Sequence, residues 1–311
     1  MFELQPVSPK NNELDNSYSS LAFQTNARLD VDLARLGELR PFPETAQRLI
    51  AMTGSEDYKV ADLRQVIEND AILTARTLEI VNSAAYGMRG RCSSITLAIR
   101  LLGSNGVRDL AVAIAGMEMY DTADLRARTL RDHNAVVGSI ARFMARKRGV
   151  PNISDLYTCA VLHDIGQLLL LQLYGEEYGQ LVDLGVEENL CQRERDRYEY
   201  DHALLAAHMV SKWRIPDPVP TVIALHHDLR RARSLGSEIH HLVAQIRLAD
   251  ELAESFLYHQ DDDDEDLIRV VVGGDAAKVL ALGEEELTGL WYDIQAVTIQ
   301  TKYLWAQFDS Q

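Results

Sequence analysis

The chain has 311 residues, enough for one large or two small domains, and its 47% hydrophobic and 25% charged residues are typical of a globular protein with a buried core. Its 47 acidic residues outnumber its 31 basic ones, and the formal net charge of −16 disfavours binding to the phosphate backbones of DNA or RNA. The three widely spaced cysteines form no CxxC pair, which argues against a disulfide framework and a zinc knuckle. No stretch reaches the roughly 18 apolar residues of a membrane span, which argues against a membrane protein.

The first segment, residues 1–28, is rich in Asn, Ser and Gln, and we expect it to be a mobile tail. It shows no basic region followed by an apolar stretch, so no secretory signal is predicted and we expect a cytoplasmic protein. Structure should begin near Val31. Apolar residues at helical spacing then predict helices over 46–52, 63–67 and 72–81.

The middle of the chain continues with helical periodicity. A helix over 94–102 precedes a break at 103–106, where two glycines flank Ser and Asn. A long helix should follow and run to Arg148, with Asp121 or Thr122 as its cap.

The second half is also read as helical. A strongly apolar stretch over 153–174 contains the dyad His163-Asp164, which we expect to lie inside an apolar helix. Further helical patterns cover 192–213 and 239–257, and the apolar run 222–225 leads into two consecutive histidines.

The C-terminal part begins with the acidic run 261–266, which lacks the spacing of a calcium loop and is read as a solvated loop. Two short helices should end the chain, the last over 284–308. Apart from the brief run Val270–Val272, no strand-like pattern stands out, so the sequence predicts an all-α protein.

Seven polar residues lie in or beside these apolar segments: His133, His163, Asp164, His202, His226, His227 and Asp250. Imidazole nitrogens combined with one or two carboxylates suit iron, manganese, zinc or nickel, and the number of ligands suits two ions bridged by Asp164. The alternative interpretation is that His163 and Asp164 form a hydrogen-bonded polar pair that joins two helices. In that case His202 and His227 could contact backbone carbonyls at helix ends.

The order of these residues, H…HD…H…HH…D, resembles that of the HD superfamily of metal-dependent phosphohydrolases. Four upstream segments resemble the HDOD domain (HD-related output domain) in particular: Leu39–Pro43, Asn69–Thr74, Asn82–Gly87 and Ser94–Ile99. The similarity covers residues 36–256. Residues 257–311 would then form a C-terminal helical extension.

The resemblance implies an all-α fold in which a leading helical bundle packs on an HD-superfamily-like bundle. It also implies a regulatory role in bacterial signal transduction, usually without enzymatic activity. In the HD-GYP relatives, which hydrolyse cyclic di-GMP, the residues that match the seven side chains bind metal. This chain has Gln167 where those relatives have a Lys, Thr129 where some have a Glu ligand, and no GYP loop after the paired histidines. These departures argue against hydrolysis of cyclic di-GMP.

We therefore predict a bacterial regulatory protein that binds a protein partner or a small nucleotide and retains one or two transition-metal ions (Fe, Mn, Zn or Ni). The alternative is a metal-dependent phosphohydrolase that acts on a nucleotide or a phosphate ester, in which Arg230 or Arg231 would replace the missing Lys. We expect no contact with membranes, and the charge of −16 disfavours a nucleic-acid-binding protein.

Overall fold

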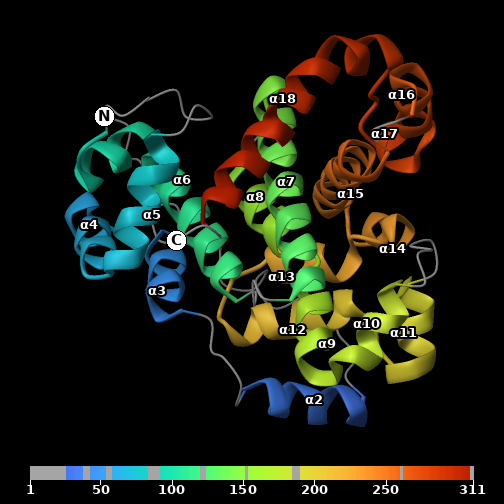
Figure 1. The fold of residues 1–311 in the computed structure, drawn as a ribbon, viewed down its shortest axis with the longest axis horizontal. Helices are drawn as coiled ribbons and strands as arrows, with labels where there is room; N and C mark the ends of the chain where they lie inside the picture. Colours follow the sequence, from blue (N-terminus) through green and yellow to red (C-terminus); the bar gives the residue numbers. More distant parts are fainter. Residues whose placement is uncertain are drawn as a thin grey trace, which may run out of the picture.

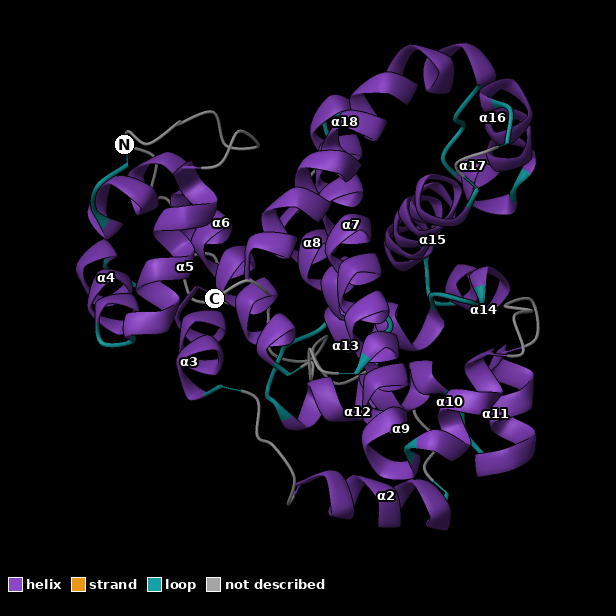
Figure 2. Ribbon diagram, in the orientation of Figure 1, coloured by secondary structure: helices purple, strands orange, loops and turns teal. Residues whose placement is uncertain are grey.

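The computed structural model describes residues 26–37, 43–53, 58–82, 92–119, 124–150, 153–183, 190–259 and 262–308. Within these ranges the chain forms helices joined by loops, and no strand occurs (Figure 2). The predicted all-α class is therefore confirmed. The strand-like run Val270–Val272 lies within a helix, so that reading was wrong. The buried residues of this helix are Ile268 and Val271, and their spacing of three is helical, while Val270 is exposed.

The N-terminal part consists of an isolated helix and a leading bundle. Helix α2 (Ala27–Gly37) lies against the second half of the molecule, apart from α3–α6 (Figure 1). The leading bundle contains α3 (Glu44–Thr53), α4 (Val60–Glu68), α5 (Ala71–Asn82) and α6 (Ile95–Glu118).

The second half contains nine helices that follow one another closely in the described chain. They are α7 (Leu125–Lys147), α8 (Ile153–Leu162), α9 (Ile165–Tyr174), α10 (Glu176–Asp183), α11 (Leu190–Tyr198), α12 (His202–Lys212), α13 (Val219–Leu225), α14 (Leu229–Ser234) and α15 (Ser237–Tyr258). Three more helices end the chain: α16 (Asp264–Gly273), α17 (Asp275–Val279) and α18 (Glu284–Phe308). The last of them crosses α7, so the C-terminal extension packs on the second half (Figure 1).

Several predicted boundaries differ from the observed ones. Structure begins before Val31, because α2 starts at Ala27 and its residue Leu29 is fully buried. Residues 1–25 of the expected tail lie outside the described residues. Asp124 caps α7 by accepting hydrogen bonds from the backbone N–H groups of its first turn, whereas the predicted caps at 121 and 122 lie outside the described residues. The break predicted at 103–106 is a kink at Gly103 (φ 70°), after which α6 resumes.

The acidic run also differs from its prediction. Asp263 caps α16 by accepting a hydrogen bond from the backbone N–H of Glu265 at 2.9 Å, and residues 264–266 form the first turn of that helix. Acidic side chains suit this position because they complement the positive end of the helix dipole. The later part of the run is thus a helix start and not a loop.

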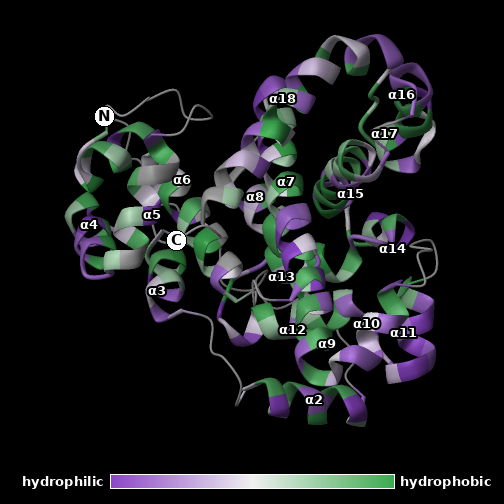
Figure 3. Cartoon of the chain, in the orientation of Figure 1, coloured by the Kyte–Doolittle hydropathy of each residue, from purple (hydrophilic) through white to green (hydrophobic). Residues whose placement is uncertain are grey.

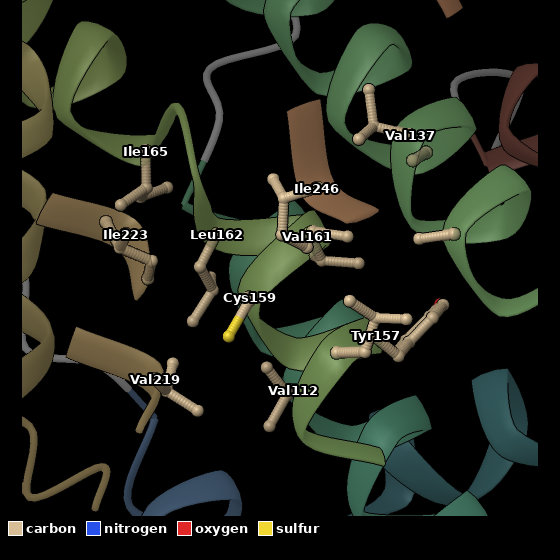
Figure 4. Packing of buried hydrophobic residues seen from close by; sticks show 14 of the residues in the cluster. Val112, Val137, Tyr157, Cys159, Val161, Leu162, Ile165, Val219, Ile223 and Ile246 are labelled. Atoms are coloured by element: carbon tan, nitrogen blue, oxygen red, sulfur yellow. The ribbon is translucent and has the colours of Figure 1, made fainter. Parts of the chain in front are cut away.

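Helix α8 lies at the centre of the core, in contact with α6, α7, α13 and α15. Figure 4 shows Cys159 of α8 beside Leu162 and Val112, and its thiol is fully buried. Asp155–Tyr174 is long and apolar enough to span a membrane, but 94% of its most apolar 18-residue stretch is buried inside the fold. In Figure 3, by contrast, α11 is mostly hydrophilic and α2 alternates between hydrophobic and hydrophilic residues. The buried face of α2 carries Leu29, Leu33 and Leu36.

Candidate metal centre

Five places in the fold supply the seven predicted residues. His133 lies in the middle of α7, and Asp250 lies within α15. His202 is the first residue of α12, and the paired histidines follow α13, with His226 as its C-cap. The dyad His163-Asp164 lies in the turn between α8 and α9.

The prediction that the dyad lies inside a helix was therefore wrong. Consecutive residues of a continuous helix point about 100° apart, which would direct the two side chains to different neighbours. The turn removes that restriction, and the chain restarts as α9 at Ile165. Gly166 is essential to this arrangement, because a Cβ atom there would lie 2.0 Å from the backbone oxygen of His202. The missing side chain lets the starts of α9 and α12 approach each other closely.

The carboxylate of Asp164 lies at the centre of the cluster. Its Oδ1 is 3.2 Å from Nε2 of His202 and 3.3 Å from Nε2 of His226. Its Oδ2 is 3.5 Å from Nε2 of His163 and 4.0 Å from Nε2 of His133. The two oxygens of one carboxylate thus face two different pairs of imidazoles.

The remaining two residues extend the cluster on opposite sides. Oδ1 of Asp250 is 3.0 Å from Nε2 of His133 and 3.6 Å from Nε2 of His163. Nε2 of His227 is 3.0 Å from Nε2 of His202. The structure therefore brings all seven predicted residues together.

The cluster divides into two groups that share Asp164. We call His133, His163 and Asp164 the α7 group, and Asp164, His202, His226 and His227 the α12 group; within each, the candidate ligand atoms lie within 4.8 Å of one another. The α7 group is buried throughout, while the α12 group reaches the surface at His227. Each group offers at least three ligand atoms, the number that a catalytic or regulatory metal site commonly uses.

Two imidazoles are fixed by hydrogen bonds to backbone carbonyls on the side away from Asp164. Nδ1 of His163 donates to the carbonyl of Ala160 at 2.8 Å, and Nδ1 of His226 donates to the carbonyl of Ile223 at 2.7 Å. A carbonyl can only accept, so in a neutral ring the Nε2 atom carries the lone pair. Metal-binding histidines are usually held in this way.

Several atoms at the centre have no hydrogen-bond partner among the described residues. They are Nε2 of His163, Nε2 of His226 and Oδ1 of Asp164, all buried. Buried lone pairs that face one another are costly unless a proton or a cation lies between them. An ion with bonds of about 2.0–2.2 Å to nitrogen and oxygen holds its ligand atoms about 3–4 Å apart, which matches the observed separations. The donor set therefore fits a transition-metal ion.

The electrostatics around His163 and Asp164 favour positive charge, whereas burial lowers the pKa of His226 and of His227. Burial opposes protonation of His163, but the charges of Asp164 and Asp250 outweigh it and raise the pKa of His163 to about 9. Burial likewise acts to raise the pKa of Asp164, yet the neighbouring imidazoles hold that pKa well below its ordinary value. Burial also acts to raise the pKa of Asp250, but hydrogen bonds from His133 and His163 lower it. Both carboxylates thus remain ionised at neutral pH and attract a cation.

Two residues outside the predicted set of seven support the cluster. Glu194 of α11 is fully buried, and its Oε2 accepts hydrogen bonds from Nδ1 of His202 at 2.7 Å and from the backbone N–H of the same residue at 2.9 Å. Gln167 donates from Nε2 to Oδ2 of Asp164 at 2.8 Å. The strongly charged segment of α11 gave no signal that one of its acids is buried, whereas the position of Gln167 after the dyad was noted.

Two further polar side chains, Thr129 and His241, lie outside the cluster. Thr129 donates its hydroxyl hydrogen to the carbonyl of Leu125 at 2.9 Å within α7, so it makes an ordinary helical contact. Nδ1 of His241 donates to the carbonyl of Ser237 at 2.7 Å. A cavity of about 450 Å³ lies between α7, α15 and the end of α17, and none of the seven cluster residues lines it.

Comparison with known proteins identifies the fold. The sequence profile of the HDOD domain matches residues 39–229, which is more than half of the chain and includes every cluster residue except Asp250. Two solved structures have a TM-score of 0.65, a candidate phosphohydrolase from Shewanella amazonensis SB2B (21% identical) and an HDOD domain protein with unknown function from Geobacter sulfurreducens (23% identical). Both alignments cover 88% of this chain and 98% of the other.

Two further relatives are longer than this chain. A candidate signal transduction protein from Marinobacter aquaeolei VT8 is 21% identical with a TM-score of 0.59, over 92% of this chain and 65% of that one. An uncharacterized protein of Treponema pallidum (strain Nichols) is 27% identical over 229 residues, which cover 73% of this chain but 43% of that protein. The chain thus spans less than half the length of this curated relative.

Proposed function

The chain belongs to the HDOD family, and on that basis we propose that it is a cytoplasmic bacterial signalling protein that binds a protein partner or a small ligand. Its histidine–carboxylate cluster would hold one or two ions of iron, manganese, zinc or nickel. With two ions, Asp164 would bridge them, one in the α7 group and one in the α12 group. The ions would then be part of the regulatory fold and not the source of turnover.

One observation carries the metal part of this proposal. The Nδ1 atoms of His163 and His226 are used by backbone carbonyls, so both Nε2 atoms point at the Asp164 carboxylate, where each is available to a proton or to a metal ion. A polar pair that merely joined two helices would satisfy its hydrogen bonds within itself. Here the Nε2 atoms of His163 and His226 and Oδ1 of Asp164 are buried without a hydrogen-bond partner among the described residues.

The contact of Gln167 favours a binding role over hydrolysis. Its side-chain amide donates to Asp164, in the position where the resemblance to HD-GYP enzymes would place a lysine. The amide can orient the carboxylate, but it adds no positive charge that would stabilise the developing charge on a phosphate. We therefore place regulation before catalysis.

A second candidate function, a metal-dependent phosphohydrolase acting on a nucleotide or phosphate ester, is supported by the completeness of the cluster. All seven residues are present, and ions held there would supply a Lewis acid able to lower the pKa of a water. Exposure of His227 gives this side of the cluster access to solvent. The positive charge that a Lys supplies in the HD-GYP relatives would have to come from another side chain.

Metal analysis of the full chain purified without chelator, together with an assay on bis(p-nitrophenyl) phosphate, separates the two functions. We expect one or two bound transition-metal ions per chain and no turnover. His241→Ala serves as the control, because it removes a histidine outside the cluster. Metal with turnover that follows metal content would favour the phosphohydrolase. A chain without metal would contradict the proposed centre.

A further inference from the structure

Helix α2 lies before the segment that matches the HDOD profile, which begins at residue 39. It packs on α9 and α12, away from the leading bundle that follows it in the sequence (Figure 1). Its fully buried residues include one carboxylate, Asp32, among the leucines. Burying an acid in an apolar face is costly unless it is fully hydrogen-bonded, so this residue calls for an explanation.

Asp32 binds side chains from two distant parts of the chain. Its Oδ2 accepts hydrogen bonds from the hydroxyl of Tyr200, at 2.8 Å, and from the hydroxyl of Tyr174. Its Oδ1 accepts from Nη1 of Arg35 at 2.9 Å, and Nη2 of Arg28 donates to the Tyr174 hydroxyl at 2.8 Å. We call these five residues the Asp32 cluster. It fastens α2 to the segment that precedes α12.

That segment, the 198–202 turn, has an unusual backbone. Glu199 adopts a left-handed conformation (φ 67°), which a residue with a side chain takes up only at some cost. Asn26, which directly precedes α2, donates from Nδ2 to the Glu199 carbonyl at 2.8 Å. Tyr200 is the next residue, and Asp201 then caps α12 by accepting from the backbone N–H of Leu204 at 2.9 Å. The N-terminal segment thus holds the turn at two consecutive residues.

The turn leads directly to a candidate metal ligand. His202 follows Asp201, and its backbone N–H and ring Nδ1 both donate to Glu194. Glu194 in turn accepts from the hydroxyl of Tyr178 at 2.6 Å. The ring of Tyr198, at the start of the turn, stacks on Tyr174 of the Asp32 cluster with centroids 4.3 Å apart. A continuous set of contacts therefore joins Asp32 to His202.

Resting on the metal centre proposed above, we infer that α2 is a positioning element for the α12 group. Asp32, through Tyr200 and the 198–202 turn, sets the backbone from which His202 approaches Asp164. The matching residues of the α7 group are held differently, since His163 is fixed by the carbonyl of Ala160 and His133 lies within a long helix. Undocking of α2 should therefore weaken metal binding in the α12 group and spare the α7 group.

Titration of the full-length metal-free chain with Co²⁺ tests this inference. The variants are Asp32→Asn and Tyr200→Phe, which weaken the Asp32 cluster, and Glu194→Gln, which acts on His202 directly. Loss of an outer hydrogen-bond partner typically costs about 10–100-fold in metal affinity. We expect a loss in this range for the Co²⁺ ion whose binding is abolished by His202→Ala, and less than threefold for the ion abolished by His133→Ala.

Asp155→Asn is the matched control. It breaks the ion pair of Asp155 with Arg108 (2.8 Å), a partly buried contact between α8 and α6, without touching the 198–202 turn. An equal loss of Co²⁺ affinity in this control would show that general destabilisation, and not positioning, explains the effect. Wild-type affinity of Asp32→Asn for both ions would overturn the role of α2 while leaving the metal centre intact.

A second measurement keeps the inference testable if the chain binds no metal. In the metal-free protein, the hydrogen that Nδ1 of His202 donates to Glu194 should give a protected signal in nuclear magnetic resonance spectra. The amides of Glu199 and His202, which donate to the Arg195 carbonyl and to Glu194, should exchange slowly. Asp32→Asn should speed that exchange at least tenfold, while Asp155→Asn should not. Unchanged exchange in Asp32→Asn would overturn the inference independently of any metal.

Discussion

The two groups that share Asp164 differ in their donors and in their surroundings. The α7 group has a second carboxylate beside it, since Asp250 lies 3.0 Å from His133 and 3.6 Å from His163. The α12 group is rich in nitrogen, with three imidazoles, and one of them is exposed. An oxygen-rich set suits harder ions such as manganese, and a nitrogen-rich set suits zinc or nickel. We therefore expect the two groups to prefer different metal ions.

The largest effect should come from removing the residue that the groups share. Asp164→Ala deletes both oxygens at the centre, so we expect neither group to retain an ion and the metal content of the purified protein to fall below about a tenth of the wild-type value. Inductively coupled plasma mass spectrometry measures this directly. Asp228→Ala, which removes an acid that caps α14 close in sequence to the paired histidines, should keep its metal. Wild-type metal content in Asp164→Ala would refute the assignment.

Removing one ligand from each group should split the effect. His202→Ala takes an imidazole from the α12 group, and His133→Ala takes one from the α7 group. We expect each variant to lose one ion and keep the other, and the double variant to lose both. Isothermal titration with Zn²⁺ and Mn²⁺ measures the remaining affinity of each variant. Identical titrations for the two single variants would show that the groups form one site and would break the comparison.

A smaller effect is expected where the two groups meet through the backbone. Gly166→Ala introduces a Cβ atom at a position only 2.0 Å from the His202 oxygen, so the starts of α9 and α12 must move apart. Overpacking of this kind costs about 1–3 kcal/mol in the free energy of unfolding. Urea denaturation measures that loss, and metal titration should show a weaker α12 group. Gly289→Ala, which meets nothing within 4 Å in α18, should instead be neutral or slightly stabilising.

The sequence predicted more of the site than is usual because the ligands are conspicuous against apolar surroundings. His163 and Asp164 interrupt a stretch of aliphatic residues, and Asp250 interrupts another. Buried polar residues of this kind need a polar partner or a cation, so the sequence indicated that they bind one. The HDOD resemblance supplied the order of the seven residues, and the structure brings all of them together. The all-α class could be predicted because apolar residues recur at helical spacing along most of the chain.

What the sequence could not predict depends on contacts between distant segments. Glu194 lies among charged residues of α11, and it is buried where α11 packs on α10 and α12. The turn at His163-Asp164 was missed because apolar residues continue on both sides, so periodicity alone could not detect the break. Asp32 was missed because one acid in an amphipathic helix is ordinarily exposed. In each case the decisive partner lies more than five residues away in the sequence.

The smallest effect concerns Cys191, which could extend the α12 group. Its thiol lies with Glu194 and His202 in a third set of atoms within 4.8 Å of one another. Burial raises the pKa of Cys191 to about 11, so at neutral pH the residue is a protonated thiol, a poor ligand compared with the neighbouring imidazoles. We expect Cys191→Ser to change metal affinity less than about threefold. The Co²⁺-loaded wild-type protein should also lack the intense near-ultraviolet band of a thiolate bound to cobalt. If the wild type shows such a band and Cys191→Ser lacks it, the α12 group includes sulfur. The description of the α12 group as nitrogen-rich, in contrast to an oxygen-rich α7 group, would then be wrong.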